Sequence, residues 1–70
     1  MITNDTELQA TQQRILLFER VLAEARKTYS ASNYKAMSEG YLKEIEVMQA
    51  EIREYLNTPV QSENLIDAVS

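Results

Sequence analysis

The residues from 8 to 29 hold an unbroken series of side chains that are spaced three and four positions apart. The series consists of Leu8, Thr11, Ile15, Phe18, Leu22, Ala25 and Tyr29. This spacing repeats the a and d positions of a heptad, so it places all seven side chains on one stripe of an α-helix. Leu16, Leu17 and Val21 lie outside the stripe and make the apolar face wider than a two-stranded seam needs. A helix of this kind requires partners, and the sequence therefore predicts a helical association module.

A second series with the same spacing predicts a second helix. It consists of Ser38, Tyr41, Ile45, Met48, Ile52 and Tyr55. We expect this helix to span residues 33–57, because Ser32 or Asn33 can cap its start and the residue before Pro59 is disfavoured in a helix.

The ends of the first helix follow from similar signals. Asn4 three positions before Glu7 fits a capping box, which predicts a helix over residues 5–30. The polar residues 28–33 compete for backbone hydrogen bonds and predict the turn between the helices.

Two helices joined by a short turn predict an all-α fold, an antiparallel two-helix hairpin over residues 1–58. Basic residues outnumber acidic ones from 14 to 27, whereas acidic residues outnumber basic ones from 35 to 54. This opposite bias favours the pairing modestly. Residues 59–70 are expected to form a C-terminal tail that is flexible or holds one short helical turn. Its apolar side chains are Val60, Leu65, Ile66 and Val69.

A single hairpin covers only one seam and leaves its other apolar side chains in water. Pairing of two hairpins into a dimeric four-helix bundle would bury them. The chain is therefore expected to form a homo-oligomer, either a dimer or a tetramer. The expected self-association interface consists of Leu8, Ile15, Leu17, Phe18, Val21, Leu22, Tyr41, Leu42, Ile45, Met48, Ile52, Tyr55 and Leu56.

The composition argues against several other classes of protein. With 70 residues the chain forms at most one domain, and it contains no cysteine or histidine, so disulfides and the usual zinc ligands are missing. The net charge of −4 argues against direct nucleic-acid binding, and no apolar run is long enough for a membrane span. No signal peptide is recognised, and a cytoplasmic protein without cofactor is expected.

Three features allow a structural and a functional interpretation. Gly40 inside the second helix marks either a close approach of another backbone or, by preference, a tolerated weak position. Glu44 and Glu51 lie seven apart, which suits a metal site less well than a solvated acidic face. The four tyrosines fit core packing better than a partner-binding patch. They are Tyr29, Tyr34, Tyr41 and Tyr55.

Several positions also suggest a family. In the first half they are Ile2-Thr3-Asn4, Thr11, Gln13, Phe18-Glu19 and Leu22, and in the second half Lys35-Ala36, Leu42, Ile45, Met48, Glu51-Ile52 and Tyr55. Together these residues resemble the N-terminal helical-hairpin segment of bacterial antitoxin-type helix-turn-helix regulators. The resemblance covers most of residues 2–56. It implies a segment for dimerisation or partner contact, here without the DNA-binding domain, so DNA binding does not carry over.

The sequence therefore predicts a small, non-enzymatic module for oligomerisation, with a further protein partner possible. The alternative is a membrane-surface protein, because residues 15–21 are rich in apolar side chains, although the acidic balance counts against it. An enzyme is the weakest of the three hypotheses: a serine–histidine triad is excluded without histidine, and no phosphate-binding glycine loop is present.

Overall fold

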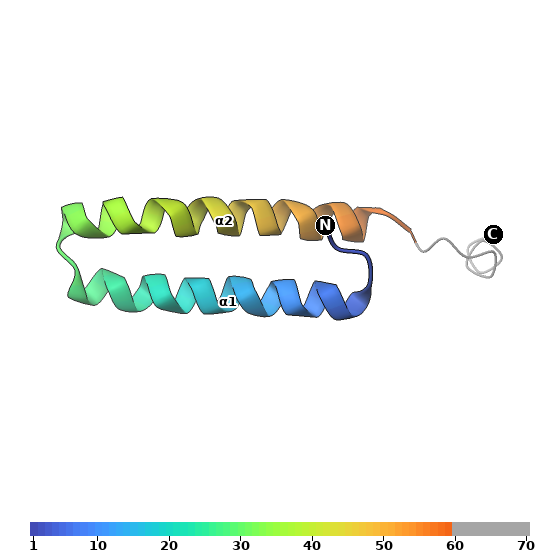
Figure 1. The fold of residues 1–70 in the computed structure, drawn as a ribbon, viewed down its shortest axis with the longest axis horizontal. Helices are drawn as coiled ribbons and strands as arrows, with labels where there is room; N and C mark the ends of the chain where they lie inside the picture. Colours follow the sequence, from blue (N-terminus) through green and yellow to red (C-terminus); the bar gives the residue numbers. More distant parts are fainter. Residues whose placement is uncertain (60–70) are drawn as a thin grey trace.

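The computed structural model describes residues 1–59, which form an antiparallel hairpin of two long helices (Figure 1). Helix α1 spans Asp5–Thr28 and helix α2 spans Ala31–Asn57, and the two helices pack against each other along their length. The described residues contain no strand. The predicted all-α hairpin is thereby confirmed, whereas the C-terminal tail expected over residues 59–70, flexible or with one short helical turn, lies outside the described residues except for Pro59.

The start of α1 is fixed by two neighbouring side chains. The Asn4 side-chain oxygen Oδ1 accepts a hydrogen bond of 2.8 Å from the backbone N–H of Glu7, as an N-cap does. The Glu7 carboxylate accepts hydrogen bonds from both the backbone N–H and the hydroxyl of Thr3, each at 2.8 Å. In a capping box this carboxylate would accept from the N-cap N–H instead. The predicted N-cap at Asn4 is therefore present. The Glu7 carboxylate, however, binds Thr3 in the segment before α1 and not the N–H of Asn4.

The turn between the helices is shorter than the polar run predicts. Tyr29 and Ser30 alone separate α1 from α2, and the Ser30 hydroxyl accepts a hydrogen bond of 3.2 Å from the N–H of Asn33. Ser30 is therefore the N-cap of α2, and the two candidates predicted from the sequence, Ser32 and Asn33, lie inside the helix. Ser30 has the extended backbone that an N-cap requires, whereas Ser32 and Asn33 have helical backbones.

The seam between the helices is built from the two predicted stripes. Its buried side chains are Ile15, Leu22 and Ala25 from α1, and Ser38, Ile45 and Met48 from α2. At mid-seam the rings of Phe18 and Tyr41 meet edge to face, with centroids 5.1 Å apart and planes at 88°. Tyr29, the last member of the first stripe, is half exposed because α1 ends one residue before it.

Two packed residues were not predicted from the sequence, Met37 and Ile2. Tyr34, which was expected to pack in the core, and Met37 both pack against the buried cluster. Met37 is found by continuing the three–four spacing of α2 backwards, since it precedes Tyr41 by four positions. Ile2 is only 8% exposed, although it lies before the first helix and has no periodic signal.

The lead-in buries Ile2 by turning back from the start of α1 toward α2 (Figure 1). The Met1 ammonium lies 3.6 Å from a carboxylate oxygen of Glu51 on α2, and this contact and the Glu7–Thr3 hydrogen bonds hold the two ends of the lead-in. Ile2 therefore covers the seam near the end of the hairpin that lies opposite the turn.

Candidate association surface

The core of the hairpin is only partly enclosed. Among the described residues no large side chain is completely buried, and even Met48, the most buried apolar one, keeps 5% of its surface exposed. Five aliphatic side chains lie largely in water, namely Leu16, Leu17, Leu42, Val47 and Leu56. Two helices alone form a single layer of packing, so apolar side chains outside the seam have nothing within the chain to cover them.

The residues expected at the self-association interface fall into three groups. Four of them are buried within the hairpin seam: Ile15, Leu22, Ile45 and Met48. Six are half-buried along its borders: Leu8, Phe18, Val21, Tyr41, Ile52 and Tyr55. Leu17, Leu42 and Leu56 are more than half exposed. The first group holds the two helices together, so only the second and third groups are accessible to a partner.

One face of the hairpin carries two adjoining hollows along the junction of the helices. The first, of about 420 Å³, is lined by Arg20, Val21, Glu24, Ala25, Thr28, Tyr29 and Met37. The second, of about 260 Å³, is lined by Phe18, Met37, Gly40, Tyr41 and Glu44. Because both include Met37, we call them together the Met37 groove. Its lining is mainly apolar, and its charged members are Arg20, Glu24 and Glu44.

Gly40 leaves an open notch in this groove. A methyl group built at Gly40 would meet no atom of residues 1–59 within 4 Å, apart from its immediate helix backbone. Among these residues, therefore, no other backbone approaches Gly40 closely. The position is an accessible depression on α2 rather than a packing contact of the hairpin.

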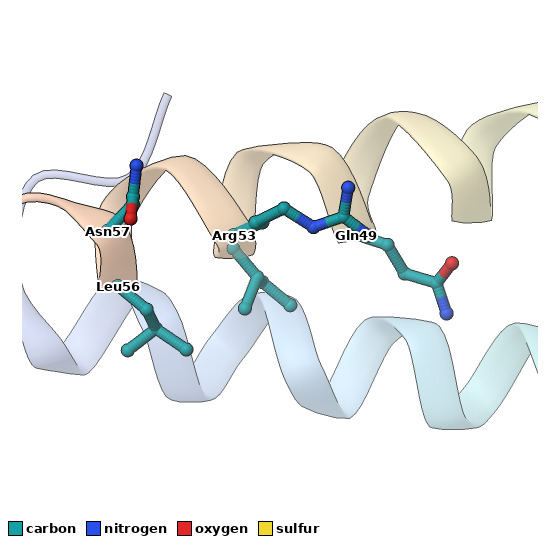
Figure 2. A pocket seen from close by; sticks show the side chains of 5 residues that line it. Gln49, Arg53, Leu56 and Asn57 are labelled. Atoms are coloured by element: carbon teal, nitrogen blue, oxygen red, sulfur yellow. The ribbon is translucent and has the colours of Figure 1, made fainter.

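A further hollow lies on α2 near its C-terminal end (Figure 2). Its lining combines Ile52 and Leu56 with the polar side chains of Gln49, Arg53 and Asn57. Figure 2 shows Arg53 lying along the helix toward Gln49, so a charged group borders this hollow. This hollow is more polar than the Met37 groove.

The end of the hairpin opposite the turn is closed by a hydrogen bond between the helices. The Tyr55 hydroxyl donates to the Asp5 carboxylate over 2.6 Å. This hydrogen bond raises the pKa of Tyr55 above its ordinary value of 10.0, because losing the proton would place a phenolate beside a carboxylate. The two helices are thus tied at both ends, by the turn and by this contact.

The charges of the two helices are not paired with each other inside the hairpin. Within residues 1–59 the ion pairs are Met1 with Glu51 and Lys27 with Glu24, and neither joins a side chain of α1 to one of α2. The opposite charge bias of the helices therefore forms no direct contact between them. The basic side chains of α1 and the acidic side chains of α2 therefore remain available to pair with another molecule.

No metal-binding geometry is found in the described part of the chain. No group of three or more acidic side chains there is arranged to hold a metal ion, and this includes Glu44 and Glu51. Neither α1 nor α2 has a stretch that is long and apolar enough to cross a bilayer. No known protein family, curated protein or solved structure matches this chain. The resemblance to antitoxin-type regulators therefore stays a prediction, and function has to be argued from the surface.

Acid is expected to release the N-terminal lead-in. Hydrogen bonds from the Thr3 backbone and hydroxyl lower the pKa of Glu7 below its ordinary value of 4.5. A carboxylate with a lowered pKa in the folded state stabilises that state above its unfolded pKa, and this stabilisation is lost as the pH falls through the folded value. In an NMR titration the Thr3 amide should therefore shift with a midpoint below 4.5, and Glu7→Gln should abolish the step. A midpoint at or above 4.5 would contradict the hydrogen-bonded arrangement.

Proposed function

We propose that this protein is a small, non-enzymatic self-association module in which two hairpins pair into a four-helix bundle. The observation that carries the proposal is the unfinished core. No large side chain among the described residues is completely buried, while five aliphatic side chains are about half exposed or more. Apolar patches of this kind on a small protein are typical of association surfaces.

Size supports the same conclusion. A chain of 70 residues buries a small share of its surface and is usually stabilised by disulfides, metals or oligomerisation. This sequence has no cysteine and no histidine, so association is the route that its composition favours.

The proposed cellular role is that of an association arm, similar to the dimerisation segment of an antitoxin-type regulator. It rests on the resemblance of residues 2–56 and on the hairpin form of the described residues. In such a role the module brings two copies together, or two attached proteins, and has no reaction of its own.

Mass in solution tests the proposal directly. The chain has a mass of 8.1 kDa, and a stable dimer should give twice that value by light scattering at tens of micromolar. Because unfolding would then be coupled to dissociation, the melting temperature should rise with protein concentration. A constant mass of one chain, with a melting temperature independent of concentration, would refute the proposal.

Liposome sedimentation distinguishes this role from the membrane-surface alternative. The self-associating module should remain in the supernatant with neutral and with anionic vesicles, because an acidic surface is not attracted to anionic lipid. Sedimentation with either kind of vesicle would favour the alternative.

A further inference from the structure

Contacts across the seam establish which residues of the two helices are level with each other. The Phe18 ring meets the Tyr41 ring, and the Asp5 carboxylate accepts a hydrogen bond from the Tyr55 hydroxyl. Because the helices are antiparallel, each step back from Phe18 along α1 corresponds to one step forward from Tyr41 along α2. The two contacts agree on this register within one residue.

This register places Gly40 between two apolar side chains of α1. Leu17 is level with Leu42 and Val21 is level with Ser38, so the level of Gly40 lies between those of Leu17 and Val21. Leu17 and Val21 are four residues apart and therefore neighbours on one side of α1. Val21 and Gly40 both line the Met37 groove, which places Val21 and the notch on the same face, and Leu17 adjoins Val21 one helical turn away on α1.

The same register also brings a basic side chain of α1 and an acidic side chain of α2 to nearly the same level. Arg14 on α1 is level with Ile45, and Glu44 is its neighbour on α2. Glu44 lines the Met37 groove, while Arg14 lines a hollow beside Ile2 at the junction of the same helices. Neither side chain forms an ion pair among the described residues.

A two-fold axis running along the length of the hairpin makes this face complementary to itself. Rotation about such an axis leaves the position of every residue along the hairpin unchanged. It places α1 of each copy against α2 of the other copy. The basic segment of each α1 then faces the acidic segment of the second copy's α2. These are the charges that one hairpin leaves unpaired between its own helices.

We propose that a second copy of this chain docks on the Met37-groove face in this way. Leu17 and Val21 of each copy lie on either side of Gly40 of the other copy, and Arg14 of each lies opposite Glu44 of the other. The absence of a side chain at Gly40 is then explained, because the notch receives the apolar ridge of the second α1. This inference rests on the proposed self-association and assigns it to one face of the hairpin.

Gly40→Leu tests the position of the interface in the full-length chain. The substitution has open space within one chain and improves helix propensity, so the helix content by circular dichroism should not fall. It fills the notch twice in a two-fold dimer, and we expect the dissociation constant to rise about thirtyfold or more through overpacking. Ala50→Leu, at an exposed alanine further along α2, is the matched control and should leave the dissociation constant unchanged.

Two charge reversals test the pairing between copies. Arg14→Glu and Glu44→Arg should each weaken self-association, because each places like charges opposite one another twice. Mixing the two variants should restore the dimer as a heterodimer, since both of its contacts are again between opposite charges. Native mass spectrometry separates the homodimers from the heterodimer by mass.

The possible outcomes separate this inference from the proposed function. A dimeric wild type in which Gly40→Leu leaves the dissociation constant unchanged, or a mixture without preference for the heterodimer, overturns the docking face but not self-association. A monomeric wild type would overturn both the docking face and the proposed self-association. Loss of the dimer in Gly40→Leu with helix content intact, together with heterodimer formation in the mixture, supports the assignment.

Discussion

Leu22→Ala is expected to be among the most destabilising single substitutions in this protein. Leu22 is 6% exposed and lies in the buried cluster with Ile15, Ile45 and Met48, so its truncation leaves a cavity between the helices. Substitutions of this kind cost about 2–5 kcal/mol in the free energy of unfolding. A hairpin with few buried side chains has a small free energy of unfolding. We therefore expect the variant to lose much of its helix content at moderate urea concentrations.

Leu16→Ala provides the matched control on the same helix. Leu16 is 48% exposed and lines neither hollow of the Met37 groove, so the same change of side chain should alter the free energy of unfolding by less than about 1 kcal/mol. Urea titrations of both variants and the wild type at one protein concentration make the comparison. Similar losses for Leu16→Ala and Leu22→Ala would show that the seam is not where the structure places it.

The seam could be predicted because its cause lies in the spacing of the residues. Three–four periodicity brings side chains to one face of a helix whatever its surroundings, and Ile15 and Ile45 were found in this way. The helix start at Asn4 was equally readable, because few residue types can accept a hydrogen bond from the first turn. These features are local, and local features are those that a sequence specifies most directly.

Other features depend on a choice among equivalent residues or on contacts distant in the chain. Ser30, Ser32 and Asn33 are all good N-caps, and only the backbone conformation at Ser30 decides between them. Ile2 is a single apolar residue without periodicity, and its burial accompanies a contact between residues far apart in the chain, Met1 and Glu51. Residue type and spacing alone do not reveal such contacts.

The exposed apolar surface was predictable only in part for a related reason. Periodicity distinguishes seam positions from outer positions, and the sequence correctly places Leu17, Leu42 and Leu56 where one hairpin leaves them exposed. It does not show which outer residues share a face, because this depends on the register between the helices. The contact of Phe18 with Tyr41 supplies that register, and the grouping of Val21 with Gly40 follows from it.

Phe18→Ala is the second substitution for which a large effect is expected. The Phe18 side chain packs against the buried cluster and meets the Tyr41 ring edge to face at a centroid distance of 5.1 Å. Removing an aromatic ring from such a site costs about 3 kcal/mol in the free energy of unfolding, at the lower end of the range for fully buried rings because Phe18 is only half-buried. Urea titration of the variant measures this loss.

A double-mutant cycle separates the ring–ring contact from general packing. Phe18→Ala and Tyr41→Ala together should cost less than the sum of the two single variants, by about 0.5–1.5 kcal/mol, because the edge-to-face contact is lost only once. Ile52→Ala is the control partner: it lies about eleven helical positions from Tyr41, roughly 16 Å along α2, so its effect should add to that of Phe18→Ala. Additivity for Phe18 with Tyr41, or strong coupling of Phe18 with Ile52, would contradict the register from which the docking face was derived.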